Sequence, residues 1–387
     1  MPELGRLALT ENTFPPEIVT SLEHLLAEMP FTPVRPLHDP GAPDVDDWAE
    51  FVNNQNGNNW LQIPWFFAET YFFRRILEAT CYFQPGKFLG VDPYLNQKYQ
   101  VLEISQPVIR TLCTQLNTML QEHITKPLDY DQVKRNLTRL LVHNLWGNQA
   151  DLSMWPAGKG ERPDHQDITI QQEHILDDDS AEMIDYLFSL NRPARINFII
   201  DNTGLELVND LILADYLLST QLASSIRFNL KVHPTYVSDA LIWDVKQTIA
   251  LLASDSHIGV QDLAKRLIHH LETDCLELVD HIFWTSPLSF WEMPVSLWEQ
   301  LADSDLLISK GDVNYRRLLG DRDWSPTISV SEVLSYIPTP LLAIRVCKAE
   351  VVMGLSPKQV DLLNQTDLTW MFNGNWGVIQ FSKGNIK

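Results

Sequence analysis

The sequence predicts an α/β domain that follows a mainly helical N-terminal region. Residues 195–200 are almost entirely apolar, which is typical of a parallel strand covered on both faces. Residues 204–218 place apolar side chains on one side at helical spacing, and residues 226–232 alternate between apolar and polar side chains as a strand does. A strand, a helix and a second strand within about forty residues indicate two parallel strands joined by a right-handed crossover.

The rest of the chain divides in the same way. The first half shows helical patterns and Pro-rich loops, and the second half alternates between helical patterns and short apolar runs. The further predicted helices are at 65–79, 101–124, 131–146, 240–252 and 259–276, the further strands at 306–308 and 341–346, and the loops around 30–43 and at 155–167. We therefore expect a mainly helical region at 1–180 and an α/β domain at 181–387.

Composition excludes several classes of protein. The 387 residues are 45% hydrophobic and 20% charged, which is ordinary for a globular protein. The net charge of −21 would repel a phosphate backbone, so we expect no nucleic-acid partner. The four cysteines are far apart, with no pair at zinc spacing. No apolar run reaches the roughly 18 residues of a membrane span, and the first residues do not resemble a signal peptide, so we expect no membrane partner and a cytoplasmic location.

Oxygen-bearing side chains follow two of the predicted strands at the point where each ends. Asp201 and Asn202 come directly after the first strand, and Asp239 lies in the loop after the second. Ligands in open α/β sheets bind outside the carboxyl ends of the strands. Carboxylate and amide oxygens suit Mg²⁺ or Mn²⁺ rather than zinc. These three residues are our candidate metal ligands, with simple capping of the helices that follow as the alternative.

The other two predicted strands also lead into polar segments. Lys310 and Arg316 flank a tight turn at Gly311, and a guanidinium can bind phosphate oxygens in a bidentate manner. The fourth strand ends with Arg345 and Lys348. The segment at 310–316, taken alone, is equally consistent with a solvated surface turn. Four polar strand exits that converge on one edge of the sheet favour a site for a metal ion and an anion.

Glu206 lies in the first turn of the helix that follows the first strand. A negative charge is favourable there in any case, because the helix dipole is positive at its N-terminus. Next to a metal site, the same carboxylate can act as a general base or bind substrate. We therefore count Asp201 and Glu206 as the two candidate catalytic carboxylates.

Six short motifs occur in order from residue 146 to residue 348. They are WGNQADLS at 146–153, DNTGLEL at 201–207, PTYVSD at 234–239, DHIFWT at 280–285, KGDVNYR at 310–316 with GDR at 320–322, and RVCK at 345–348. Together they resemble the damage-control phosphatases, in the subgroup of acidic-residue-methyltransferase-like proteins. The chain departs from that subgroup where Val346 replaces a threonine, Tyr236 a tryptophan and Leu205 a phenylalanine.

The resemblance implies a fold, a site and an activity. The fold is a helical N-terminal region packed on a three-layer α/β/α domain with a largely parallel, Rossmann-like sheet. The implied site consists of metal ligands Asp201, Asn202 and Asp239, an active-site acid at Glu206, and phosphate contacts from Asp312, Asn314, Arg316 and Lys348, to which the turn adds Lys310. The activity is hydrolysis of phosphate monoesters with Mn²⁺, Mg²⁺, Co²⁺ or Ni²⁺. The substrates of this subgroup are sugar phosphates such as fructose 1-phosphate and fructose 6-phosphate.

Two other functions compete with a phosphatase. One is an S-adenosylmethionine-dependent methyltransferase acting on protein glutamates, a label attached to animal members of the subgroup. No glycine-rich nucleotide loop follows the first strand, which weighs against it. The other is a non-catalytic protein that binds sugar phosphate or metal. Within the phosphatase hypothesis, either Asp201 or Glu206 accepts the proton of the attacking water, or Asp201 attacks directly.

Overall fold

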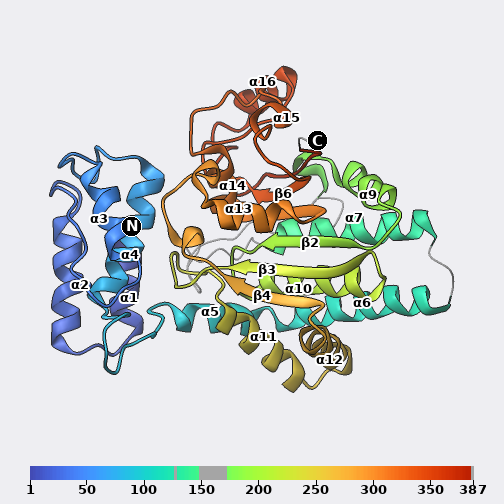
Figure 1. Cartoon of the computed structure of the whole chain (residues 1–387), viewed down its shortest axis with the longest axis horizontal. Coiled ribbons are helices and arrows are strands. Elements are labelled where there is room, and N and C mark those ends of the chain that lie inside the picture. Colours follow the sequence, from blue (N-terminus) through green and yellow to red (C-terminus); the bar gives the residue numbers. More distant parts are fainter. Residues whose placement is uncertain (126–128, 148–171, 385–387) are drawn as a thin grey trace.

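A mostly parallel sheet crosses the centre of the protein (Figure 1). The computed structural model describes residues 1–125, 129–147 and 172–384. Within these residues the sheet has seven strands in the order β1-β7-β6-β5-β2-β3-β4. The strands are β1 (Ile175–Asp178), β2 (Ala194–Ile199), β3 (Ala223–Leu230), β4 (Leu276–Asp280), β5 (Leu306–Lys310), β6 (Leu341–Val346) and β7 (Gly377–Ser382). The predicted loop at 155–167 and all but two residues of the WGNQADLS motif lie outside the described residues.

Strand pairing confirms the α/β prediction. Neighbouring strands run parallel except β6 and β7, which are antiparallel. The four strands predicted from the sequence are β6, β5, β2 and β3, and they are consecutive neighbours in the sheet. Their carboxyl ends therefore share one edge, as the sequence argument required. The predicted helix at 259–276 is too long, because it ends at Glu272 and β4 begins at Leu276.

Helices cover both faces of the sheet. Successive side chains of a strand point to opposite faces, so the apolar strands present side chains that must be buried on both sides. Phe198 packs into a core shared with α7, α9, α10 and α12, whereas Ile199 faces the core on the opposite side. The helices on the first side are α7 (Tyr130–Trp146), α9 (Ser180–Ser189), α10 (Gly204–Ser219), α11 (Ile242–Ser254) and α12 (Ile258–Glu272). The second side has α13 (Val295–Ala302), α14 (Gly311–Leu319), α15 (Val330–Val333), and two 3-10 helices, η2 (Ile282–Thr285) and η3 (Phe290–Glu292). The remaining helix, α16 (Pro357–Thr366), packs through Leu363 into a separate small core with Cys347 and Trp370.

The helix after β2 is buried all round, contrary to the two-sided pattern read from its sequence. In α10 the polar residues Glu206, Asn209 and Asp210 are as buried as the leucines. A helix covered on every side belongs to the interior of a large domain. Here α10 lies between β3 and a further layer, α5 (Leu95–Ile104) and α6 (Gln106–Thr125).

The predicted helix at 101–124 is interrupted in the structure. It corresponds to the end of α5 and to α6, with Ser105 between them. Pro107 is the second residue of α6, and proline has no N–H to donate to the preceding turn. Proline is tolerated in the first turn of a helix but not in its interior, so the first helix ends before it.

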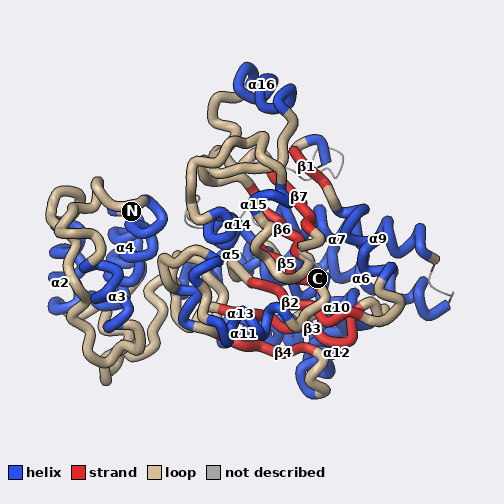
Figure 2. The backbone as a smooth tube through the Cα atoms, turned by 45° about the horizontal axis from the view of Figure 1, so that its top comes forward, coloured by secondary structure: helices blue, strands red, loops and turns tan. Residues whose placement is uncertain are grey.

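Four N-terminal helices form a separate block beside the sheet (Figure 2). They are α1 (Pro2–Glu11), α2 (Pro16–Glu28), α3 (Val45–Asn53) and α4 (Trp65–Ala79), of which the sequence predicted only α4. Their core also contains Tyr236 and Val237 from the loop after β3. The Tyr236 ring lies 5.0 Å from the ring of Phe73. The N-terminal block thereby fixes the loop that carries Asp239, while the division at residue 180 stays a prediction.

No helix in the described part of the chain is both long and apolar enough to cross a membrane.

Candidate active site

The loops after β2 and β3 are joined at the carboxyl edge of the sheet. Asn202 and Asp239 form an isolated antiparallel bridge. The N–H of Thr203 donates to the carbonyl of Ser238 at 2.7 Å, and the N–H of Ala240 donates to the carbonyl of Asp201 at 2.9 Å. The three predicted metal ligands are therefore on two loops that hydrogen bond to each other.

Asn202 links the two candidate catalytic carboxylates. Its amide nitrogen donates to Asp201 Oδ2 at 2.9 Å and to Glu206 Oε2 at 3.0 Å. The hydroxyl of Ser238 donates to its amide oxygen at 2.7 Å. These contacts fix which end of the amide faces which neighbour, and all four side chains are buried. The structure brings Asp201, Asn202 and Glu206 together as predicted.

Lys231 holds the two aspartates of the site. Its ammonium lies 3.0 Å from Asp201 Oδ1 and 3.0 Å from Asp239 Oδ1. The other carboxylate oxygen of Asp239 accepts the backbone N–H groups of Thr235 and Tyr236. Burial raises the pKa of Asp201 to about 7, although the charge of Lys231 acts in the opposite direction.

A second buried lysine joins the site from the end of β5. Lys310 Nζ lies 3.1 Å from Glu206 Oε1 and 3.4 Å from Asp210 Oδ1, and Asn144 donates to the same Asp210 oxygen at 2.7 Å. Burial alone would lower the pKa of Lys310, but Asp210 and Glu206 raise it above its ordinary value. Lys310 was predicted to contact phosphate, and in the structure two carboxylates already neutralise its charge.

The predicted phosphate-binding loop forms the first turns of α14. Asp312 accepts hydrogen bonds from Arg345 Nε at 2.7 Å and from the backbone N–H of Lys348 at 3.2 Å. Asn314 donates to the carbonyls of Lys310 at 2.9 Å and Ile200 at 3.3 Å. The loop is thus tied to the ends of β6, β5 and β2.

Arg316 is neutralised by carboxylates in the structure. It donates to both oxygens of Asp321, at 2.8 and 3.1 Å, and its third contact is Glu69 Oε2 of α4 at 2.6 Å. Bidentate pairing of this kind uses the part of the guanidinium that would otherwise face a phosphate. The sequence placed Arg316 and Asp321 in one motif but gave no sign that Glu69 contacts Arg316.

Gly311 brings the backbone of α14 against the first candidate ligand. Its φ is +80°, which favours glycine. A Cβ at this position would lie 1.9 Å from Asp201 Oδ2. No other residue type allows α14 to begin this close to the Asp201 carboxylate.

Known proteins resemble this chain in sequence over most of its length. The family described as the damage-control phosphatase ARMT1-like domain matches residues 10–363. The chain belongs to this family. It is 36% identical to damage-control phosphatase ARMT1 of Danio rerio, over 90% of this chain and 82% of that protein. The proteins of the same name from Bos taurus and Homo sapiens are 34% and 31% identical to this chain. Each alignment covers 87% of this chain and 80% of the relative.

Membership of the damage-control phosphatase family supports a hydrolase, a phosphatase with a role in metabolite repair. A solved structure of a DUF89 family protein from Pyrococcus horikoshii aligns with a TM-score of 0.47 at 15% identity, over 97% of this chain and 93% of that chain.

The donor atoms of this family member fit a hard divalent cation. Among the described residues, Asn314 Oδ1 is a buried acceptor with no hydrogen-bond donor, and Asp239 Oδ1 meets only the ammonium of Lys231, so both oxygens can accept a cation. Within the described residues, no group of three His, Cys, Asp or Glu side chains is placed to hold a metal ion. Asp201, Asn202 and Asp239 would hold such a cation, and in this structure the ammonium of Lys231 supplies the positive charge between the two aspartates.

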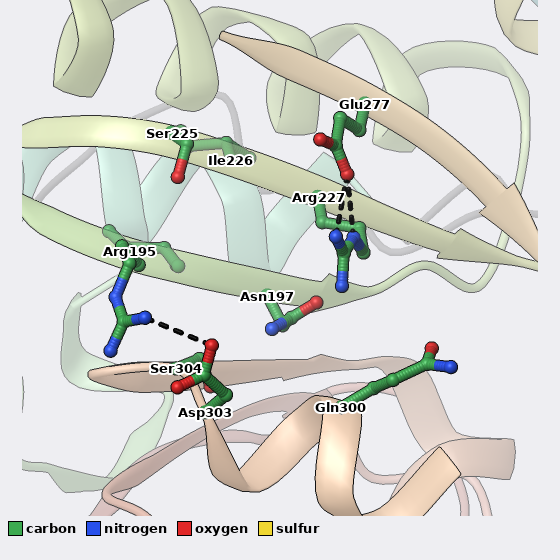
Figure 3. A pocket seen from close by; sticks show the side chains of 10 residues that line it. Arg195, Asn197, Ser225, Ile226, Arg227, Glu277, Gln300, Asp303 and Ser304 are labelled. Carbon is green, nitrogen blue, oxygen red and sulfur yellow. Dashed lines mark hydrogen bonds and ion pairs between the residues drawn. The ribbon is translucent and has the colours of Figure 1, made fainter. Parts of the chain in front are cut away.

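A separate groove of about 80 Å³ lies on the face of β2 and β3 next to α13 (Figure 3). Arg195 and Arg227 from these strands line it, and they pair with Asp303 and Glu277 respectively. Figure 3 shows both pairs beside Asn197. None of the predicted site residues lines this groove, so it does not belong to the candidate site.

Sequence reasoning missed three polar residues of this site. Lys231 falls on the polar side of the alternating strand pattern, and that pattern does not distinguish a solvent face from a buried rim. Asp210 lies four residues after Glu206, which places both on one side of α10. Glu69 lies in a helix predicted correctly, yet nothing in its sequence indicates contact with α14.

Proposed function

We propose that the protein is a divalent-metal-dependent phosphatase that hydrolyses the phosphate monoesters of small sugars, of the fructose 1-phosphate and fructose 6-phosphate type. The observation that carries the proposal is the joining of Asp201, Asn202 and Asp239 by two hydrogen-bonded loops at the carboxyl edge of the sheet. Family membership supports the reaction class. The sugar-phosphate preference comes from the motif resemblance.

The metal would be held by Asp201, Asn202 and Asp239, with Mn²⁺ or Mg²⁺ favoured by the oxygen donors and Co²⁺ or Ni²⁺ also accepted. When bound, such an ion supplies positive charge that polarises a phosphoryl oxygen. The protein holds its own ligands in place, because Asn202 is oriented by Ser238 and Asp239 is oriented by two backbone N–H groups.

Glu206 and Asp201 are the two groups that can accept a proton from water. Glu206 receives hydrogen bonds from Asn202 and Lys310, which keep its carboxylate beside the candidate ligands. In the metal-free protein, burial raises the pKa of the Asp201 carboxyl to about 7. The N-terminus of α14 lies against Asp201, and its helix dipole favours an anion there.

A panel of sugar phosphates, each with Mn²⁺, Mg²⁺, Co²⁺ or Ni²⁺ in turn, tests the proposal through release of inorganic phosphate. Asp239→Ala should abolish turnover of fructose 1-phosphate with Mn²⁺. Asp303→Ala, a carboxylate of the separate groove, should leave turnover unchanged. Activity retained in Asp239→Ala would contradict the metal assignment, and methyl transfer from S-adenosylmethionine without phosphate release would favour the rival function.

A further inference from the structure

Among the described residues, one buried cation has no carboxylate partner. Eight lysine and arginine side chains are buried within the described residues, and seven of them form ion pairs. The eighth is Arg317, which is 1% exposed and lies within 4.0 Å of no carboxylate among those residues. A buried charge without a counter-ion is costly, so its persistence calls for a reason.

The Arg317 guanidinium is held by backbone and aromatic groups. Its Nη1 donates to the carbonyl of Leu288 at 2.5 Å and its Nη2 to the carbonyl of Trp284 at 3.3 Å, while its buried Nε has no acceptor. Its central carbon lies 5.3 Å from the ring centre of Phe66 and 5.1 Å from that of Phe283. Two rings and two carbonyls thus position the cation without neutralising it.

Arg317 is on the side of α14 that faces the candidate site. It follows Val313 and Asn314 by four and three residues, so the three share one helix face. Asn314 bonds to the carbonyl of Ile200 beside Asp201, and Val313 packs against the core that contains Tyr236. Long helical side chains lean toward the N-terminus, which directs Arg317 back toward that edge.

Electrostatics agree with this placement. Burial lowers the pKa of Arg317 to about 10, and the charges of Asp239 and Asp201 act on it in the opposite direction. The guanidinium therefore remains charged at neutral pH. By contrast, two of the three cations that the sequence assigned to phosphate, Lys310 and Arg316, each have two carboxylate partners.

We propose that Arg317 is the anion-recognising residue of the site, and that its missing counter-ion is the phosphoryl group of the substrate. This inference rests on the proposed phosphatase function. A phosphate dianion offers acceptors for the unused N–H groups of the guanidinium, and such charge-assisted hydrogen bonds are about twice as strong as neutral ones. The energy lost by burying the free cation is recovered when the anion binds, which makes the contact sensitive to phosphate.

Binding of inorganic phosphate to the full-length protein tests the inference, by calorimetry and by thermal unfolding, with and without Mn²⁺. Arg317→Gln keeps an N–H donor for the backbone carbonyls but removes the charge. It should weaken phosphate binding about tenfold to a hundredfold, with an unchanged or higher Tm in the absence of phosphate. Arg317→Lys should restore part of the affinity. Arg195→Gln, at the far end of β2, makes the same change in net charge and should bind phosphate as the parent does.

A purely structural role for Arg317 gives the opposite pattern. The Tm of Arg317→Gln would fall, while its dissociation constant for phosphate and its KM for a sugar phosphate would equal those of the parent. The inference is overturned if either of these two constants is unchanged in Arg317→Gln. If Arg317→Gln does not fold, Arg317→Lys decides, because an altered phosphate affinity supports the inference and parental affinity overturns it. If the parent hydrolyses no sugar phosphate but binds phosphate through Arg317, the proposed phosphatase function is refuted and the role of Arg317 in anion binding is supported.

Discussion

Substitution of Gly311 by alanine separates the geometry of the site from the stability of the fold. The added Cβ would lie 1.9 Å from Asp201 Oδ2, whereas ordinary contact begins at 3.4 Å, so the carboxylate must withdraw by about 1.5 Å. A displacement of about 1 Å at reacting groups can cost about a hundredfold in rate. We expect kcat/KM for fructose 1-phosphate with Mn²⁺ to fall by about that factor or more.

Gly57→Ala is the matched control for Gly311→Ala. Gly57 has a φ of +76°, close to the +80° of Gly311, but nothing lies within 4 Å of a Cβ built there. Both variants lose roughly 1–2 kcal/mol of stability from the left-handed backbone, measured by denaturant unfolding. Only Gly311→Ala should lose activity. Equal kcat/KM in the two alanine variants would refute the claim that Gly311 sets the position of Asp201.

Three further predictions concern charge in the fold. Lys231→Met leaves Asp201 and Asp239 buried without the lysine that pairs with both, so the metal-free protein should lose about 3–5 kcal/mol of unfolding free energy. Mn²⁺ should raise the Tm of this variant more than it raises the Tm of the parent. An unchanged stability of the metal-free variant would be inconsistent with the pairing. Chelation with EDTA should abolish phosphatase activity while circular dichroism stays constant, because Lys231 still holds both aspartates; activity that survives chelation would rule out the metal requirement. Burial raises the pKa of Asp177 to about 6, so its contribution to stability is present below about pH 4 and lost as the pH rises through 6. Near pH 8 the unfolding free energy of Asp177→Asn should exceed that of the parent by about 1 kcal/mol, allowing for partial exposure, and near pH 4 the two unfolding free energies should be equal. A gain in stability that does not vary with pH would contradict the raised pKa of Asp177 as its cause.

Apolar periodicity determined the fold class and the edge of the sheet where the site lies. The strand at 194–199 is a nearly continuous apolar run and the strand at 223–230 contains alternating apolar and polar residues, and each pattern can be read from the local sequence. Parallel strands joined by one helix end on the same side, so Asp201 and Asp239 had to meet once the strands were neighbours. Three short strands, β1, β4 and β7, were missed. The four residues of β1 and the five of β4 are mostly half-buried, and the six of β7, although buried, mix polar and apolar side chains, so none of the three carries a clear periodic signal.

The tertiary structure alone decided how the charges are paired. Arg316 contacts Glu69, which is 247 residues away in the sequence, and no local pattern indicates that partner. The same polar alternation places Arg227 in an open groove and Lys231 in a buried ion pair, because exposure depends on what packs over the strand. Whether the charge of a lysine or arginine is neutralised depends on its distance from carboxylates that are remote in the sequence and near only in the folded chain. That is why the sequence alone did not single out Arg317.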